Sequence, residues 1–274
     1  MKYSVAILAT FATISASVLA QPVELTAIEM SSIKGGEYLM GSPASEFERQ
    51  KDETQHKVRI NDFMLARHEL SQKLYREVMG NNPSAHQGDE LPVENISWFD
   101  AIRFCNALSH KNGLEPAYEI NQLPSGDIHV TWNKTANGFR LPTEAEWEFA
   151  ARAGSSTPFN TGENISANQA NYYGTYPYRD RPSELYRGET IAIGSFRPNA
   201  WELYDMHGNV WEWCWDRYGA YQQDNESINP TGAEIGQFRV NRGGGFNDFG
   251  KHLRSAYRAA HNPNNKTFNI GMRL

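Results

Sequence analysis

Residues 202–218 read ELYDMHGNVWEWCWDRY and carry a clear alternating pattern. Three tryptophans alternate with two acidic residues and a cysteine, in the order Trp211, Glu212, Trp213, Cys214, Trp215 and Asp216. Side chains in a β-strand repeat every two residues, so this pattern predicts a strand with one aromatic and one acidic face. The dipeptide Gly208-Asn209 immediately before it predicts a turn.

The same turn offers oxygen atoms that could bind a metal ion. Asn209, the neighbouring backbone carbonyls and Glu212 are hard oxygen donors, which suit Ca²⁺ better than a soft metal. Only three candidate ligands are local, whereas calcium sites use about 6–8 oxygens. A tight turn in which Asn209 caps its own backbone and Glu212 forms an ion pair explains the same residues, and spacing alone favours that interpretation.

Three segments have helical periodicity and recognisable ends. In residues 141–154, Thr143 and Glu146 have the spacing of a capping box, and a glycine closes the helix. In residues 97–113, Ser97 is the expected N-cap, and the apolar positions, including Cys105, share one face. A third helix is expected to start at Ser71.

The rest of the chain has the pattern of short strands and long loops. Strands are expected within residues 35–42, 56–70, 128–132, 138–141, 209–216, 238–244 and 270–274. Helices in the first half and short strands scattered through the second predict an α+β fold rather than a wound parallel sheet. No linker-like stretch interrupts the chain, which favours one compact, loop-rich domain.

The first twenty residues predict the cellular compartment. Lys2 precedes an apolar, uncharged run that ends in Val18-Leu19-Ala20, which is typical of a secretory signal peptide cleaved after Ala20. A membrane anchor is the alternative, but the run is short for a membrane span. Cleavage leaves residues 21–274, with 25 basic and 32 acidic residues. We therefore expect a periplasmic or secreted protein without a nucleic-acid partner and without a membrane span.

The cysteines and histidines show no recognisable catalytic or metal-binding motif. Cys105 and Cys214 are the only cysteines, and an exported protein can keep a disulfide. Sequence does not show whether the two side chains meet, and two buried apolar residues explain them at least as well. None of the eight histidines belongs to a His-Glu-x-x-His motif or a Cys/His cluster.

Seven blocks, in a fixed order, resemble the formylglycine-generating enzyme family, also called the sulfatase-modifying factor family. They are residues 35–42, 66–84, 91–109, 138–154, 203–216, 239–258 and 270–274, including the stretches GFRLPTEAEWEFAARAG, LYDMHGNVWEWCWD and RVNRGGGFND. The resemblance covers nearly all of residues 21–274. It implies one compact domain of the C-type-lectin-like type.

The resemblance also implies calcium at two places. The first would use Asn209, Val210 and Glu212. The second falls on Asn171, Tyr172, Glu184 and Tyr186, where Glu184 stands at the position of a family aspartate and Tyr186 offers its carbonyl.

The copper chemistry of the family does not carry over. Aerobic formylglycine-forming members bind copper through two cysteine thiolates just after an RGGS turn. Here residues 242–248 read RGGGFND, Gly245 replaces the serine, and no cysteine follows as far as Leu274. Because Cu(I) needs soft thiolate ligands, formylglycine formation by that mechanism is not expected.

Two functions remain open at this stage. The first is an exported oxidoreductase or maturation factor acting on a peptide or peptide-derived metabolite, similar to the exported branch associated with pyoverdine maturation. The second is a non-catalytic, calcium-stabilised, lectin-like ligand-binding module. Both would use a groove beside the RGG turn, and a redox metal, iron or copper, is undetermined.

The groove residues have different expected roles. The candidate catalytic residues are Asp248, His252 and Arg254, and the candidate substrate-binding residues are Arg242, Phe246, Asn247 and Arg258. The arginines would hold a carboxylate, and Asp248 or His252 would act as acid, base or metal ligand.

Overall fold

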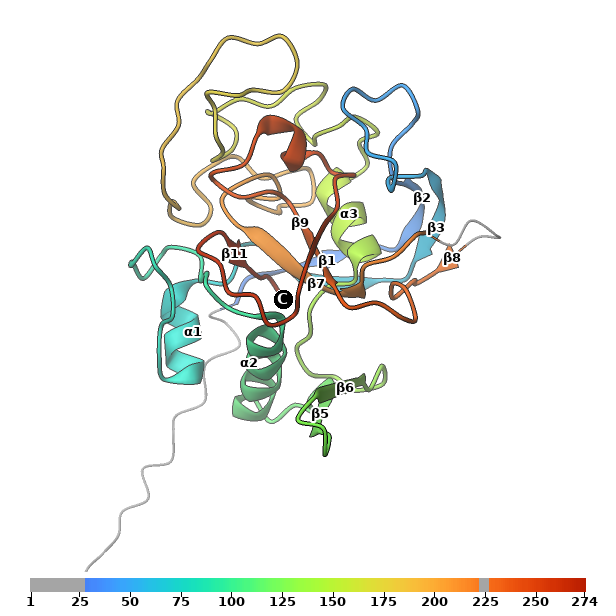
Figure 1. Ribbon diagram of the computed structural model, residues 1–274, viewed down its shortest axis with the longest axis vertical. Helices are drawn as coiled ribbons and strands as arrows, with labels where there is room; N and C mark the ends of the chain where they lie inside the picture. Colours follow the sequence, from blue (N-terminus) through green and yellow to red (C-terminus); the bar gives the residue numbers. More distant parts are fainter. Residues whose placement is uncertain (1–27, 222–226) are drawn as a thin grey trace, which may run out of the picture.

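A four-stranded sheet with the strand order β10-β9-β7-β11 lies at the centre of the molecule (Figure 1). The computed structural model describes residues 28–221 and 227–274, so the expected signal peptide lies outside the described residues. The strands are β7 (Trp211–Arg217), β9 (Arg239–Arg242), β10 (Ala259–His261) and β11 (Ile270–Gly271). Strand β7 is antiparallel to β9 and parallel to β11.

Both faces of strand β7 are buried. Trp213 on one face and Glu212 on the other are both fully inaccessible to solvent. Trp147 Nε1 donates to Glu212 Oε2 over 2.7 Å, and the backbone N–H of Glu144 donates to Asp216 Oδ2 over 2.8 Å. The predicted strand is confirmed, but its acidic face packs inside the protein because helix α3 (Glu144–Arg152) covers it.

Local capping defines the three helices α1 (Gln72–Met79), α2 (Trp98–Lys111) and α3. Ser71 caps α1, and its side chain accepts the N–H of Leu74. Ser97 and Thr143 form complete capping boxes at the starts of α2 and α3. All three predicted helices are therefore confirmed, together with their N-caps.

The remaining strands form small sheets around the centre. They are β1 (Met30–Ile33) with β4 (Phe63–Ala66), β2 (Gly36–Met40) with β3 (His56–Ile60) and β8 (Ser227–Ile228), and β5 (Tyr118–Gln122) with β6 (Ile128–Trp132). The strand predicted over residues 138–141 is wrong. The N–H groups of Phe139 and Leu141 donate to the side chains of Ser109 and Tyr118 instead of to a neighbouring strand.

Hydrophobic clusters lie on either side of the central sheet. Helices α1 and α2 pack against one side and helix α3 against the other (Figure 1). Cys105 belongs to the first cluster and Cys214 to the second, and both thiols are free. The α+β prediction is confirmed, and the interpretation of the cysteines as two buried apolar side chains is correct.

Loops make up most of the region between α3 and β7, drawn from green to orange in Figure 1. Backbone hydrogen bonds fix this region to the rest of the domain, because Tyr173 N donates to Asp248 O and Ser255 N donates to Pro158 O. In the described part of the chain, no helix is both long enough and apolar enough to span a membrane.

Candidate functional site

The site begins at the RGG turn, which leaves no room for side chains. Gly243 and Gly244 have φ angles of 97° and 80°, in the left-handed region that favours glycine. A Cβ atom on Gly244 would lie 2.7 Å from the side chain of Leu253. The turn therefore fixes the path of the chain into the short 3₁₀ helix η2 (Gly250–Leu253).

Asp248 connects this turn to strand β7 and to helix η2. Its Oδ2 atom accepts hydrogen bonds from Gly245 N over 2.9 Å and from Trp211 Nε1 over 2.7 Å. Its Oδ1 atom lies 3.0 Å from His252 Nδ1. A Cβ atom on Gly245 would lie 3.2 Å from Asp248 Oδ2, a tight contact that the carboxylate would have to shift slightly to accommodate.

Asp248 and His252 form an acid–imidazole pair at the surface. Their side chains keep 18% and 21% of their accessible surface, so solvent and ligands can reach them. A proton on His252 Nδ1 is held by Asp248, which leaves Nε2 as the basic nitrogen. An imidazole oriented by a carboxylate can take up and return a proton, which is general acid–base chemistry.

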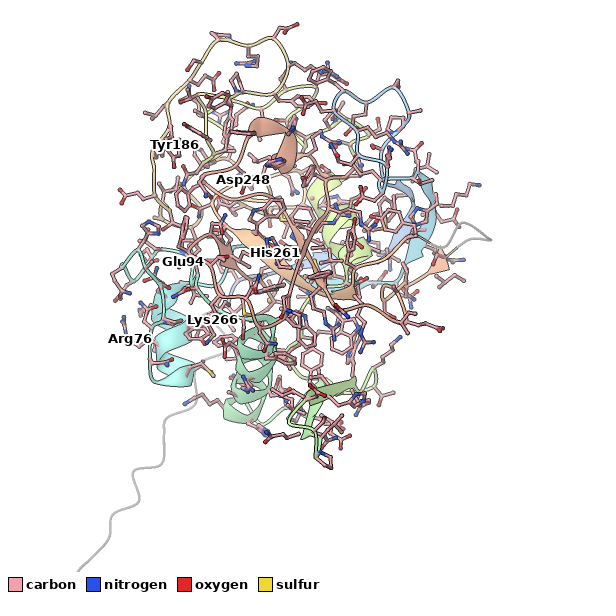
Figure 2. All side chains as sticks on the ribbon, viewed as in Figure 1. Arg76, Glu94, Tyr186, Asp248, His261 and Lys266 are labelled. Atoms are coloured by element: carbon pink, nitrogen blue, oxygen red, sulfur yellow. The ribbon has the colours of Figure 1, made fainter. Side chains whose placement is uncertain are left out.

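Aromatic rings surround the imidazole of His252. The rings of Phe249 and Tyr257 lie 5.7 and 4.8 Å from it, centroid to centroid. Burial raises the pKa of Tyr257, and the charge of Asp248 raises it further. Phe249 also contacts Tyr176 at 5.0 Å, so the aromatic surface continues into the loop that contains Tyr186. Figure 2 shows Asp248 and Tyr186 in the upper half of the molecule, away from Arg76 on helix α1.

The structure corrects the expectation that three arginines face a ligand. Arg242, Arg254 and Arg258 are all buried. Arg242 Nη2 donates to Glu148 Oε2 over 2.7 Å, and Arg258 Nε donates to Glu144 Oε1 over 2.6 Å. Because buried carboxylates hold the guanidinium groups, these arginines stabilise the interior and are not free to hold a substrate carboxylate.

Phe246 and Asn247 also differ from their expected roles. Phe246 is only 2% exposed and packs edge-on against His86. Asn247 is partly buried, and its Oδ1 atom accepts from Asn269 Nδ2 over 2.9 Å. Of the seven catalytic and substrate-binding candidates, Asp248 and His252 are therefore the pair that meets at an accessible surface.

Comparison with known proteins identifies the family. A family model described as "Sulfatase-modifying factor enzyme 1-like domain" matches residues 15–274. The chain belongs to this family. Chaperone protein LppX of Paenibacillus barcinonensis is 38% identical over 208 residues, which cover 69% of this chain and 71% of LppX.

Two solved structures superpose on most of this chain. Treponema denticola variable protein 1 superposes with a TM-score of 0.76 and 29% identity, over 89% of this chain and 93% of that chain. PvdO from Pseudomonas aeruginosa superposes with a TM-score of 0.69 and 27% identity, over 89% of this chain and 92% of PvdO. The resemblance inferred from the sequence blocks is thus confirmed.

The side chains of the first calcium set implied by the family resemblance form hydrogen bonds within the protein. Both carboxylate oxygens of Glu212 accept hydrogen bonds of 2.6 Å from Arg273. The amide of Asn209 donates to Glu69 and accepts from Asn171. The side-chain oxygens of Asn209 and Glu212 are engaged within the protein, and Val210 is fully buried beside them.

The second calcium set keeps one unengaged oxygen. Asn171 Nδ2 donates to Glu189 O over 2.9 Å, but its buried Oδ1 atom has no hydrogen-bond partner among the described residues. Glu184 accepts from the backbone of Ala167 and from Arg181. Tyr172 is buried and Tyr186 is 37% exposed. An orphaned amide oxygen is the kind of atom that a bound cation or water would satisfy.

Sequence reasoning missed two carboxylates in this region. Glu69 accepts from Asn209 Nδ2 over 2.7 Å and from Val210 N over 3.1 Å. Burial raises the pKa of Asp205 to about 6, and its Oδ1 atom is buried without a partner in the described structure. Glu69 lies 140 residues from Asn209 in sequence, so no local pattern could have shown the contact.

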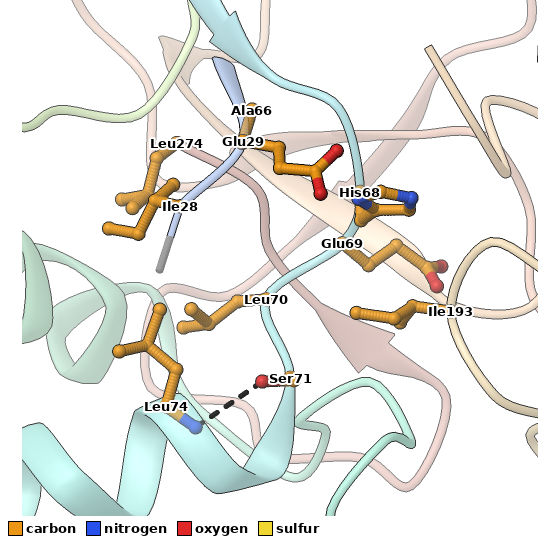
Figure 3. Close-up of a pocket in the computed structure, with 10 residues that line it drawn as sticks. All are labelled: Ile28, Glu29, Ala66, His68, Glu69, Leu70, Ser71, Leu74, Ile193 and Leu274. Atoms are coloured by element: carbon orange, nitrogen blue, oxygen red, sulfur yellow. Dashed lines mark hydrogen bonds between the residues drawn. The ribbon is translucent and has the colours of Figure 1, made fainter. Parts of the chain in front are cut away.

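Glu69 also lines a small cavity, shown in Figure 3. His68 and Glu29 lie on its polar side, and Leu70 and Leu74 on its apolar side. Its volume of about 70 Å³ is enough for water but not for a substrate, since ligand pockets hold about 300–1,000 Å³. We therefore place the candidate functional site at Asp248 and His252 and not at this cavity.

The described residues do not assemble a redox-metal site. No group of three or more histidine, cysteine, aspartate or glutamate side chains is arranged to hold a metal ion in residues 28–221 and 227–274. Asp248 already uses both oxygens within the protein. Burial also raises the pKa of the Cys105 and Cys214 thiols, which lie in separate clusters and form no pair of thiolates.

Proposed function

We propose that this protein is an exported maturation factor that acts on a peptide or peptide-derived metabolite at the Asp248–His252 pair. The observation that supports this most directly is the accessible carboxylate–imidazole contact of 3.0 Å beside the RGG turn. Asp248 stands within the segment where copper-dependent family members carry thiolates. The proposed chemistry therefore uses proton transfer in place of copper-thiolate chemistry.

Each residue of the pair has a defined part in this proposal. His252 Nε2 removes a proton from the bound substrate and returns it later in the reaction. Asp248 orients the imidazole and stabilises the imidazolium that forms. Trp211 and Gly245 donate hydrogen bonds that hold Asp248 in place. Overall activity as an oxidoreductase would need an oxidant supplied with the substrate, so we derive only the proton-transfer step from these residues.

The relatives support a role in maturation. LppX is named as a chaperone, and the family branch that the sequence blocks resemble is associated with pyoverdine maturation. The name of LppX describes action on another protein. The signal-peptide pattern of residues 1–20 supports export to the periplasm or the medium, where such a substrate would be met.

A complementation experiment tests the proposed function. A strain lacking the gene would receive the wild-type protein, Asp248→Asn or His252→Gln, and mass spectrometry would compare exported peptides and metabolites. We expect a product that depends on the wild-type protein and that falls about 10²–10⁴-fold with either variant, the usual contribution of general acid–base catalysis. His129→Gln is the matched control, because His129 is exposed on β6, outside the site.

The outcome distinguishes this proposal from its alternative. Full product levels with both folded variants of the pair would contradict acid–base catalysis there. The alternative is a non-catalytic ligand-binding module stabilised by calcium, for which the orphaned Asn171 Oδ1 atom offers a ligand without distinguishing the two functions. Calcium in either case would have a structural role, at the set formed by Asn171, Tyr172, Glu184 and Tyr186.

A further inference from the structure

A pocket lined by several aromatic side chains, the aromatic pocket, lies beside the Asp248–His252 pair. It has a volume of about 360 Å³ and is lined by residues 175–181, Phe47, Phe249 and Lys251, among others. Three of its aromatic side chains are unusually exposed, with Phe47 at 47%, Tyr176 at 54% and Phe249 at 40%. Exposed aromatic rings gathered around a pocket are typical of a binding site.

The walls of this aromatic pocket are held in place. The Tyr178 hydroxyl donates to Phe47 O over 2.6 Å, and Gly250 N donates to Tyr176 O over 3.2 Å. A Cβ atom on Gly250 would lie 2.6 Å from Tyr178 N, so helix η2 and the loop touch backbone to backbone. The pocket is therefore preformed, which lowers the entropic cost of binding.

Phe249 belongs to both the pocket and the candidate catalytic site. Its ring stacks on His252 at 5.7 Å and contacts Tyr176 at 5.0 Å. A molecule that reacts at His252 can therefore reach the pocket with a neighbouring side chain. The two sites form one continuous surface.

The cationic side chains around the pocket are already paired, whereas the exposed Asp180 forms no ion pair among the described residues. Lys251 lies 3.2 Å from Glu48, Arg179 lies 2.9 Å from Glu163, and Arg181 lies 2.9 Å from Glu184. An acidic group entering the pocket would have to compete with these ion pairs. The exposed ring faces and edges are the free binding surface, and they favour an uncharged aromatic group through stacked or edge-to-face contacts.

We propose that this pocket binds an aromatic side chain of the peptide substrate, next to the group that reacts at His252. The inference rests on the proposed function for its biological meaning, but the binding it describes can be measured without catalysis. It commits to tyrosine, phenylalanine or tryptophan side chains as the occupant. Sugars and aliphatic side chains are the competing occupants.

The test uses N-acetyl-tyrosinamide as the probe and the protein without its signal peptide. Titration followed by NMR chemical shifts should give saturable binding with a Kd on the order of 1–10 mM, as expected for so small a ligand. Tyr176→Ala and Phe249→Ala should each weaken binding about tenfold, because each removes one ring contact and the apolar area around it. Phe238→Ala is the matched control, since Phe238 is 45% exposed and does not line the pocket.

Further ligands and one further variant make the result decisive. His129→Gln should keep the affinity of the wild-type protein, because His129 lies on β6, outside the pocket. Failure of the complementation experiment with normal probe binding would then reject the catalytic proposal alone. Equal binding of N-acetyl-leucinamide or methyl glucoside, absence of saturable binding, or unchanged affinity in both aromatic variants would overturn the aromatic pocket.

Discussion

Arg254 and Glu53 form a bidentate ion pair, although they lie 201 residues apart in the sequence. Arg254 Nη1 donates to Glu53 Oε2 and Nη2 donates to Glu53 Oε1, each over 2.7 Å. Both side chains are fully buried. The pair attaches the loop before strand β3 to the segment that follows helix η2, and thus supports the backbone behind His252.

Removing one member of this pair should be strongly destabilising. Arg254→Met leaves Glu53 buried without its cation, and breaking such a pair costs about 3–5 kcal/mol. Chemical denaturation should therefore show a loss of that size in the free energy of unfolding. Lys34→Met is the control, because Lys34 and Asp62 are highly exposed and solvent screens their ion pair. Equal losses in the two variants would contradict the structural role of Arg254.

Local signals explain which parts of the fold the sequence predicted. Ser97 caps α2 and Thr143 caps α3 through bonds to residues three positions away, so a short pattern contains the whole interaction. The segment 138–141 was mispredicted because its N–H groups bond to side chains from distant elements. No local pattern records such contacts.

The contrast between local patterns and contacts of distant residues also applies to the candidate site. Asp248 and His252 are four residues apart, and both could be proposed from one stretch of sequence. The sequence shows the charge of the arginines around them but not their burial. The prediction that these arginines hold a substrate carboxylate is therefore wrong. Tyr176 comes from a loop with no regular structure, and only the three-dimensional fold brings it to Phe249.

The two cysteines should be unreactive in the folded protein. Burial raises the pKa of the Cys105 and Cys214 thiols, and the thiolate is the reactive form. Iodoacetamide should therefore add no mass to the native protein at neutral pH and two labels after unfolding in denaturant. A denatured protein that accepts no label until it is reduced would show a disulfide instead.

Gly208 should not tolerate a side chain. Its φ angle is 90°, and a Cβ atom would lie 2.3 Å from Asn171 O. Gly208→Ala should lower the free energy of unfolding by more than about 2 kcal/mol, because left-handed strain and a backbone clash add together. Gly113→Ala is the control for strain alone, since Gly113 has a φ angle of 67° and open space around it. The same loss in both variants would show that the contact with Asn171 is unimportant.

Acid should destabilise the protein through His207. Burial lowers the pKa of His207 to about 4, whereas an unfolded histidine titrates near about 6.5. Between these values the unfolded chain binds more protons, so the free energy of unfolding should fall by about 3 kcal/mol as pH drops from 6.5 to 4. The neutral ring bridges two loops, with Nδ1 2.7 Å from Leu253 O and Nε2 accepting from Asn160 N.

The variant His207→Asn separates the effect of His207 on the free energy of unfolding from the effect of groups whose protonation favours folding. Asp205, whose pKa is raised to about 6, binds its proton more tightly in the folded state and should favour folding as pH falls through the same range. Denaturation curves of the wild type and His207→Asn should therefore be compared at each pH. The wild type should lose more stability than the variant between pH 6.5 and 4, and parallel curves would assign the acid sensitivity elsewhere.

Calcium removal should lower the melting temperature if the ion satisfies Asn171 Oδ1, the buried oxygen without a partner in the described structure. An ion present at about 100 times its Kd stabilises the folded state by about 2.7 kcal/mol. For a domain of this size that corresponds to a shift of about 5–10 °C on addition of a chelator.

Asn171→Ala should melt lower than the wild type and show no further shift with chelator. Asn121→Ala, at an exposed position on β5, should keep the wild-type response. A wild-type melting temperature that is the same with chelator and with added calcium would refute the calcium assignment, and the free oxygen of Asn171 would then be satisfied by water.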